Sequence, residues 1–448
     1  MSILNNKGIL IAAILISGFF NTIKGSDFIR NFNDSTLRID YILAGGPQGA
    51  QIYIDSSSKQ AGWSGRKTRL KEIPVKGNGT IMVLDPVTGD TLYMNSFSTL
   101  FQEWINTPEA SVASHSFESS FLVPLPKREA DIKLELRNNY HQPVASYTHR
   151  YRPDDELVSI VGQHPMPHTF IHEGNGENVI DVALIAEGYR EEEMDTFLKR
   201  AKMITDEILS YEPFASNKDK FRFVAVKTPS AESGTSVPLK KDWRNTAFGS
   251  HYSTFYSPRY LTVPRVKKMH QALEGIPYEH IIVVVNTPEY GGGGIFNNYQ
   301  VAAADNAQTP VVVVHEFGHS FGGLADEYFY KNEEDDTYPD GIEPWEKNIT
   351  TLVDFDSKWA DKVSKDTPVP TPWAKEVNTR EMTMAKAKPT SPEEMLVGVY
   401  EGAGYRSSGV YRPFITCRMR DNVYPAFCEV CEEALKDIIV FYTSSDTE

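Results

Sequence analysis

The segment HEFGHSFGGLADEY, which runs from His315 to Tyr328, contains the side chains in this sequence that are best suited to bind a metal ion and transfer a proton. His315 and His319 are four residues apart, and side chains at that spacing lie on the same face of a helix. Their imidazoles can therefore hold one metal ion together. Glu316 would then lie beside the open coordination position, where a carboxylate can take a proton from a metal-activated water. We expect Zn²⁺, because catalytic zinc sites use three protein ligands and a water.

The residues before this pair give conflicting signals. Four consecutive valines, Val311 to Val314, favour a strand by propensity. Thr309 followed by Pro310 is instead a good helix start, with the threonine as N-cap. On a strand the two histidines would point to the same side but lie too far apart for one ion. We therefore predict a buried helix, which also accounts for the apolar valines.

The third metal ligand is expected beyond a sharp turn that follows the second histidine. Gly322 lies where the helix must stop, because glycine adopts positive φ freely, and Gly323 suits the same turn. In long HExxHxxGxx motifs the third ligand usually follows the glycine by three residues, but Ala325 cannot bind a metal. We assign Asp326 as the third ligand and keep Glu327 as an alternative ligand or a supporting residue.

Composition sets the scale of the molecule and narrows its partners. The chain has 448 residues, which is too long for one compact core, so we expect two domains. Its composition, 40% hydrophobic and 23% charged, is that of an ordinary globular protein. The net charge of −15 argues against nucleic acid, which needs a basic patch, and against an anionic membrane surface.

The N-terminus has the layout of a secretory signal peptide. Lys7 precedes an apolar run from Ile9 to Phe20, and the small polar stretch that follows ends at Gly25. The apolar run is short for a membrane span, although an uncleaved anchor or a buried first helix is an alternative. We predict a signal peptide at 1–25 and an exported protein that is periplasmic, cell-surface or secreted, with no membrane span after cleavage.

Alternating hydrophobic patterns predict an all-β sandwich over residues 26–155. The pattern is clear at 37–42, 80–84 and 130–136, and turn signals separate these stretches. Residues 156–178 are predicted to form a solvated linker. Three histidines there are spaced by four residues, but two prolines prevent the helix that would align them as ligands: His164, His168 and His172.

Residues 179–448 are predicted to form an α/β catalytic domain. Apolar strands are expected at 179–185, 221–226 and 280–285, the last of them central in the sheet, with an amphipathic helix at 192–209. Before the histidine helix, the four glycines from Gly291 to Gly294 suit either an edge strand that pairs with an extended peptide or a flexible connector.

All three cysteines lie near the C-terminus. Cys417 could form a disulfide with Cys428 or Cys431, which would leave one thiol over. The Cys428–Cys431 pair also has the spacing of a zinc knuckle, but a knuckle needs four ligands and the sequence offers no second pair.

The motif HEFGHSFGGLADEY resembles that of the IgA-peptidase family of zinc metallopeptidases. Two C-terminal regions and two N-terminal stretches agree with the catalytic and accessory domains of that family: 398–405 with 409–413, 416–420 with 427–431, 62–65 and 96–104. The resemblance implies an α/β (α+β) metzincin-like zinc peptidase domain preceded by the β-sandwich domain. It also implies a secreted endopeptidase that cleaves protein or peptide substrates, extracellular and immunoglobulin-like host proteins among them.

The resemblance assigns further residues to the site. In metzincin-like folds a methionine lies beneath the metal on a tight turn, and Met419 is the candidate here. Cys417 beside it suggests a disulfide that pins this turn. A tyrosine near the metal could stabilise the oxyanion, for which Tyr405 and Tyr411 are the candidates.

Two other functions fit parts of the sequence. A host-glycoprotein-binding protein with a structural metal site would use the β-rich domain for recognition, but a structural site has no need of a base such as Glu316. A zinc amidase that acts on a non-protein amide would share the metal chemistry and differ in substrate.

Overall fold

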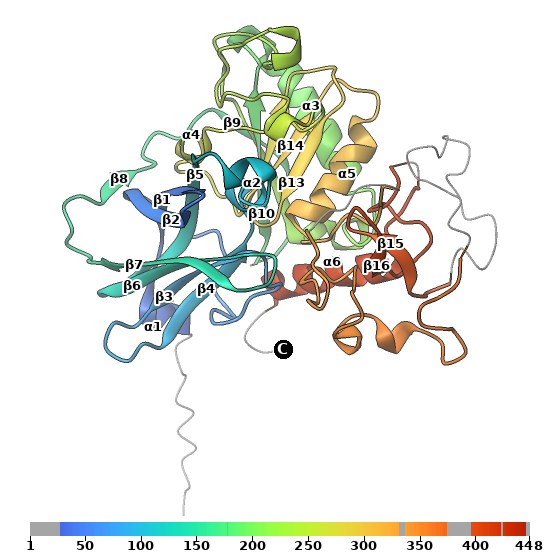
Figure 1. Ribbon diagram of the computed structural model, residues 1–448. Helices are drawn as coiled ribbons and strands as arrows, with labels where there is room; N and C mark the ends of the chain where they lie inside the picture. The colour runs from blue at the N-terminus through green and yellow to red at the C-terminus, as the bar shows by residue number, and fades with distance from the viewer. Residues whose placement is uncertain (1–26, 177, 331–336, 374–395, 423, 445–448) are drawn as a thin grey trace, which may run out of the picture.

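The computed structural model describes residues 27–176, 178–330, 337–373, 396–422 and 424–444. The predicted signal peptide at 1–25 lies outside the described residues. Figure 1 shows a strand-rich N-terminal part beside a part in which helices pack on a mixed sheet. The chain is thus a mixed α/β protein with several sheets.

The N-terminal part contains two four-stranded sheets, ordered β5-β1-β2-β8 and β4-β3-β6-β7. Their strands are β1 (Phe32–Gly46), β2 (Gly49–Ala61), β3 (Gly79–Leu84), β4 (Thr91–Phe97), β5 (His115–Pro126), β6 (Ala130–Arg137), β7 (Pro143–Tyr151) and β8 (Ser159–Val161). Buried side chains from both sheets form one hydrophobic cluster. The strands predicted at 37–42, 80–84 and 130–136 are confirmed, because alternation places one face of each strand in this cluster. Short helices α1 (Asp27–Asn31) and α2 (Leu100–Trp104) flank the sheets.

The segment expected as a solvated linker instead contributes one strand to an N-terminal sheet and one strand to the six-stranded sheet of the second part. β8 pairs in parallel with β2, and β9 (His168–His172) pairs with β11 (Phe221–Val226). On β9, His168 is exposed and His172 is partly buried, and they bond the backbone carbonyl oxygens of Met166 and Lys218, respectively. Neither belongs to a metal-binding group among the described residues.

A six-stranded sheet forms the frame of the second part, in the order β13-β14-β12-β10-β11-β9. Its remaining strands are β10 (Ile180–Glu187), β12 (His280–Val285), β13 (Gly292–Ile295) and β14 (Tyr299–Ala303). β14, β12, β10 and β11 run parallel, and the edge strands β13 and β9 are antiparallel to their neighbours. The predicted central position of β12 is confirmed. Every residue of β12 is buried, which is possible only for a strand that is covered on both faces, and such a strand lies in the middle of a sheet.

Helices cover both faces of this sheet. α3 (Met194–Ile208), α5 (Thr309–Ser320) and α6 (Glu429–Thr443) pack on one face, and α4 (Val266–Ala272) packs on the other. The hairpin of β15 (Tyr400–Ala403) and β16 (Arg406–Arg412) lies on the α5 side, near α6 (Figure 1). The helix predicted at 192–209 is confirmed as α3, and the buried valines before the histidine pair lie in α5.

The ends of α5 differ in detail from the sequence prediction. Gln308, not Thr309, is the N-cap residue, while Pro310 occupies the first turn as expected. The Thr309 hydroxyl donates to the carbonyl oxygen of Ala303, 2.5 Å away, so it ties the helix to β14. At the C-terminal end the positive φ falls on Gly323 (+59°) rather than on Gly322. Gly322 is needed for a different reason: a Cβ there would lie 2.6 Å from the carbonyl oxygen of Gly318.

The N-terminal part holds the turn of the β13–β14 hairpin. The backbone N–H of Ser98 donates to the carbonyl oxygen of Phe296 at 2.9 Å. The side chains of Asn297 and Asn298 donate in return to the carbonyl oxygens of Ser96 (2.7 Å) and Ser98 (3.1 Å). The edge strand β13 of the six-stranded sheet is therefore braced by the N-terminal part.

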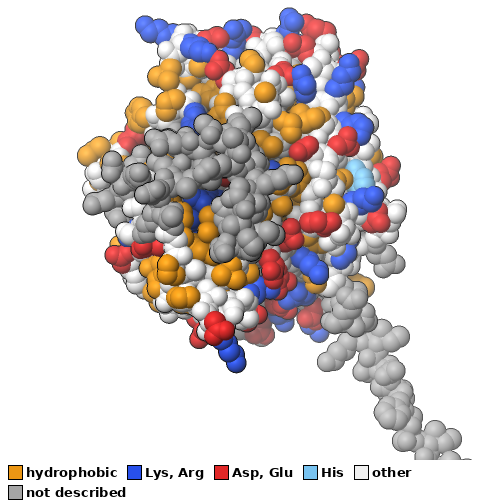
Figure 2. Space-filling model, turned by 90° about the vertical axis from the view of Figure 1, so that its right-hand side faces the viewer, with side chains coloured by type: hydrophobic (Ala, Val, Ile, Leu, Met, Phe, Trp, Pro, Cys, Tyr) orange, Lys and Arg blue, Asp and Glu red, His pale blue; other side chains and the backbone are white. Residues whose placement is uncertain are grey.

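Charged side chains of both signs share the molecular surface. On the face shown in Figure 2, basic and acidic side chains of the described residues are interspersed with scattered hydrophobic ones. The net charge of −15 is therefore not gathered into one patch on this face. Within the described ranges, no helix combines the length and apolarity that crossing a bilayer requires.

The close approach of β13 to α5 generates a first prediction. A Cβ at Gly294 would lie 2.3 Å from the carbonyl oxygen of Glu316 and 2.9 Å from Cβ of His319, and the backbone contact cannot move aside. Gly294→Ala should therefore lower the free energy of unfolding by about 1–3 kcal/mol. Gly176→Ala is the control, because an added methyl there makes only ordinary contacts and should change stability by less than about 0.5 kcal/mol. Denaturant unfolding measures both, and equal midpoints would contradict the prediction.

Candidate metal centre

Three side chains converge where α5 ends and the chain turns back. The Nε2 atoms of His315 and His319 are 3.1 Å apart. Oδ1 of Asp326 lies 3.1 Å from the first of these atoms and 3.3 Å from the second. The helix supplies both imidazoles because it places positions i and i+4 on one face, and the turn at Gly323 returns the aspartate to them.

Backbone carbonyls fix the orientation of both imidazoles. Nδ1 of His315 lies 2.9 Å from the carbonyl oxygen of Arg418, and Nδ1 of His319 lies 2.6 Å from that of Leu324. A carbonyl oxygen only accepts, so each Nδ1 carries a proton, and the neutral form of each imidazole presents its lone pair at Nε2. This arrangement holds an imidazole ready to bind a metal.

One of the three convergent atoms is a buried acceptor without a hydrogen-bond donor in the described part of the chain. Among the described residues, Oδ1 of Asp326 has no hydrogen-bond donor, although the side chain is only 6% exposed. Burial lowers the pKa of His319, but the Asp326 carboxylate outweighs this and raises it to about 9. Burial opposes ionisation of Asp326, yet the two imidazoles hold its pKa well below its usual range. The pocket therefore attracts positive charge, and a metal cation fits it.

Glu316 lies beside this pocket and lines the same cleft. Burial raises the pKa of Glu316, and the imidazoles of His315 and His319 only partly oppose the shift. A carboxylate with a raised pKa is a better proton acceptor, which is the property that a general base requires.

The two candidate tyrosines have different positions. The hydroxyl of Tyr405 donates to Oδ2 of Asp326 at 2.5 Å, and its ring lines the cleft. Burial and the neighbouring Asp326 raise the pKa of Tyr405 well above its usual value, so the hydroxyl keeps its proton. Tyr411 lies on β16, where its backbone pairs with Thr350, and its side chain does not line the cleft.

Met419 lies in a turn directly beneath α5. Arg420 and Asp421 both donate their backbone N–H groups to the carbonyl oxygen of Cys417, which closes the turn. Met419 is fully buried, and a Cβ on Gly318 would lie 2.6 Å from its Sδ atom. The turn thus supports the helix from below, and its Arg418 carbonyl holds His315.

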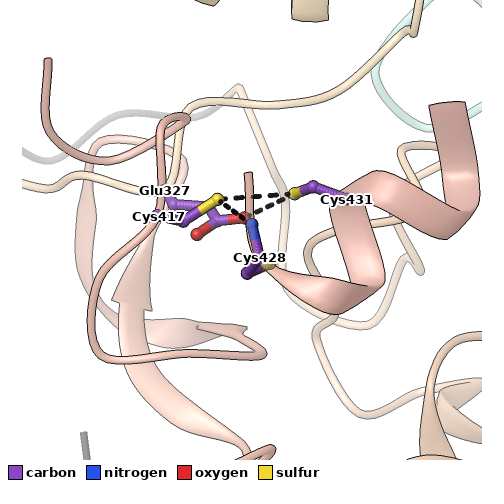
Figure 3. Close-up of side chains that lie close together, drawn as sticks. All are labelled: Glu327, Cys417, Cys428 and Cys431. Carbon is purple, nitrogen blue, oxygen red and sulfur yellow. Dashed lines mark hydrogen bonds between the residues drawn. The ribbon is translucent and has the colours of Figure 1, made fainter. Parts of the chain in front are cut away.

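Glu327 points away from the histidine pair. Its Oε1 accepts from Nδ2 of Asn348 at 2.9 Å and lies 3.1 Å from Sγ of Cys431. Figure 3 shows this carboxylate among the three cysteines. All three cysteines are free thiols, so the disulfide considered from the sequence is not formed; the Sγ atoms of Cys417 and Cys431 are 3.7 Å apart.

A cleft of about 760 Å³ opens above the histidine pair. Tyrosines from four segments line it, together with the glycines of β13: Tyr260, Tyr290, Tyr328, Tyr330 and Tyr405. Glu103 of α2, in the N-terminal part, also lines this cleft and accepts a hydrogen bond from the hydroxyl of Tyr260. An adjoining hollow of about 310 Å³ shares Glu103, His319 and Asp326 and is lined on one side by the N-terminal part.

Sequence reasoning missed Glu103 and Asn348. The Asn348 side chain bonds both the N–H and the carbonyl oxygen of Ala325, at 2.8 and 2.9 Å, as well as Glu327. It thereby fixes the chain on both sides of Asp326. Neither residue carries a local sequence signal, because each reaches the site only through tertiary packing.

In this mixed α/β fold, one helix presents two histidines one turn apart, and a carboxylate converges on them beside a glutamate. This arrangement is typical of a metal-dependent hydrolase. The comparisons refine this class. Residues 170–391 and 381–439 match the family model described as IgA Peptidase M64, and residues 27–148 match the model described as Peptidase M64 N-terminus. The chain therefore belongs to the IgA-peptidase family of metallopeptidases, which are hydrolases that act on peptide bonds. No curated protein matches it.

The Tyr405–Asp326 hydrogen bond generates a second prediction. Tyr405→Phe removes the donor to the carboxylate and should weaken metal affinity by about 10–100-fold, the usual effect of losing a hydrogen bond to a ligand. Tyr411→Phe is the matched control and should leave the affinity unchanged. Competition with a chromogenic chelator measures both. Equal affinities in the two variants would show that the hydroxyl does not support the ligand.

Proposed function

We propose that the chain is an exported zinc-dependent endopeptidase with a metzincin-like catalytic domain, in which Glu316 is the general base. The observation that carries the proposal is the convergence of two imidazole nitrogens and a carboxylate oxygen beside Glu316, on the floor of a cleft bordered by an edge strand. A binding protein with a structural metal site would need neither the base nor the open cleft.

Zinc is the metal that the donor set suits best. Ligand atoms about 2.1 Å from a tetrahedral zinc lie about 3.4 Å from one another, and the three observed separations are 3.1, 3.1 and 3.3 Å. His315, His319 and Asp326 would hold the ion. When bound, it would supply Lewis acidity to the scissile carbonyl and to an attacking water.

Glu316 supplies the proton transfers of hydrolysis. Its carboxylate accepts a proton from the attacking water and returns it to the leaving amine, so no covalent intermediate is needed. The raised pKa of Glu316, caused mainly by burial, supports this role. The hydroxyl of Tyr405 keeps its proton and donates it to Asp326, so it could donate to a developing oxyanion only after leaving that carboxylate.

An extended peptide can pair with β13. The strand is at the edge of the sheet, and its glycines from Gly292 to Gly294 line the cleft. A single backbone bridge to Tyr260 engages Gly292. Backbone pairing holds a substrate in one register while leaving its side chains free to meet the tyrosine-lined walls.

The metzincin-like assignment is supported by the turn at Met419 beneath α5 and by the antiparallel edge strand beside the helix. Export is supported by the N-terminal sequence pattern. Export favours extracellular proteins as substrates, and the description of the matching family model adds immunoglobulin-like host proteins to the candidates.

Glu316→Gln tests the assigned base. The amide keeps the size of the side chain but cannot take a proton, so cleavage of an unfolded protein should fall by at least about 10²–10⁴-fold. Bound zinc, measured by mass spectrometry of the purified protein, should be retained. Substantial residual cleavage by the variant would sink the proposal that Glu316 is the base.

The position of Glu103 predicts that the accessory domain contributes to substrate binding. Glu103→Ala removes the partner of Tyr260 and opens one wall of the cleft. Within the described residues, Glu103 forms no hydrogen bond with the ligands or with Glu316, although its charge interacts with His319 and Glu316. KM for a protein substrate should rise by about three- to tenfold, roughly 1 kcal/mol of binding, with a smaller change in kcat. Glu129→Ala, an exposed acid on the same domain, should change neither constant. An unchanged KM in Glu103→Ala would exclude this wall from the binding site.

A further inference from the structure

A second group of ligand-type side chains lies behind the histidine pair. Glu327, Cys417, Cys428 and Cys431 place their carboxylate oxygen and three Sγ atoms within 4.8 Å of one another. Every one of these residues is at most 4% exposed. They come from separate parts of the chain: the segment after α5, the Met419 turn and the start of α6 (Figure 3).

Neither a disulfide nor ordinary core packing satisfies this group. The Sγ atoms of Cys417 and Cys431 are 3.7 Å apart, whereas a disulfide requires about 2.0 Å. Any one disulfide would leave a thiol and a carboxylate behind. Oε2 of Glu327 has no hydrogen-bond partner among the described residues, and such a buried, unsatisfied carboxylate oxygen is costly.

The distances instead suit one tetrahedral ion. Sulfur atoms about 2.3 Å from zinc lie about 3.8 Å from each other, close to the 3.7 Å observed. Glu327 is also held as a ligand would be, because Asn348 donates to its Oε1 at 2.9 Å. Cys428 and Cys431, at the start of α6, have the two-residue spacing of a zinc knuckle.

Positive charge close to the group offsets the excess of negative charge that such a site would carry. Arg412 is fully buried and interacts electrostatically with both Glu327 and Cys417. Arg420, 3% exposed, also interacts with Glu327. Buried guanidinium groups next to thiolates and a carboxylate stabilise the ionised forms that a metal requires.

We propose that Glu327, Cys417, Cys428 and Cys431 bind a structural zinc ion, distinct from the metal held by the histidine pair. Four protein ligands close the site, so it has no open position for substrate or water. The fold supplies the two ligands that the Cys428–Cys431 pair lacks in the sequence.

This ion would stabilise the catalytic centre from behind. Glu327 directly follows Asp326, and its backbone N–H donates to the carbonyl oxygen of Met419 at 2.9 Å. Cys417 directly precedes Arg418, whose carbonyl holds His315. Zinc bound at this second site would therefore hold in place the segment that carries Asp326. It would also hold the turn whose Arg418 carbonyl orients His315.

Metal counting on the full chain, purified with a reductant and equilibrated with zinc, tests the proposal. We expect two zinc ions per wild-type chain and one in His315→Ala, where the remaining ion is released by a mercurial that captures thiolates. Cobalt loaded into His315→Ala should give thiolate-to-metal charge-transfer absorption. These measurements leave the cysteines intact, so they do not depend on a cysteine variant folding.

A paired substitution checks the ligand assignment. Glu327→Gln should lose one zinc or bind it at least about tenfold more weakly, whereas Asp181→Asn, a buried carboxylate paired with Arg222, should keep both. One zinc in the wild type, with either three freely titratable thiols or a disulfide detected by mass, would overturn the proposal. Failure of the peptidase assignment would appear separately, as lost cleavage or a missing zinc at the histidines with the thiolate signature intact.

Discussion

Three acceptor atoms, from His315, His319 and Asp326, converge on one point, and the surrounding segments must hold them there. Two Nε2 lone pairs and a carboxylate oxygen repel one another until a cation lies between them. Such an arrangement persists only where the surroundings over-determine it. Here the helix fixes the imidazole spacing, two backbone carbonyls fix the ring orientations, and the hydroxyl of Tyr405 fixes the carboxylate. The Met419 turn and the hairpin that carries Tyr405 belong to the site for this reason.

The sequence could predict those parts of the site and its frame that depend on local backbone geometry. Several strands of the N-terminal sheets and of the six-stranded sheet, and the helix with its proline start, could be predicted, because periodicity and backbone chemistry specify them. Which of two adjacent acids faces the histidines could not be derived this way. Consecutive residues of an extended segment point to opposite sides, so Asp326 meets the imidazoles while Glu327 meets the cysteines. Asn348 and Glu103 depend on packing between distant segments, for which the sequence carries no local signal.

The N-terminal part contributes directly to the cleft. It holds the β13–β14 turn through three hydrogen bonds and contributes Glu103 to the lining of the cleft. A domain whose sequence contains no catalytic group thereby affects both the position of the strand that borders the cleft and the shape of the space above it. Residues 27–148 and the region that carries the histidine pair also match two models of the same family.

The short glycine strand at the sheet edge has a consequence for the solution behaviour of the protein. An open edge invites pairing with the edges of other molecules, which leads to fibres and aggregates. β13 spans only four residues, three of them glycine, and glycine has weak intrinsic preference for strands. Its glycines line the cleft together with Tyr260 and Glu103. So short and glycine-rich a strand is a poor template for another sheet, and β13 therefore does not offer the long, flat edge through which folded proteins polymerise.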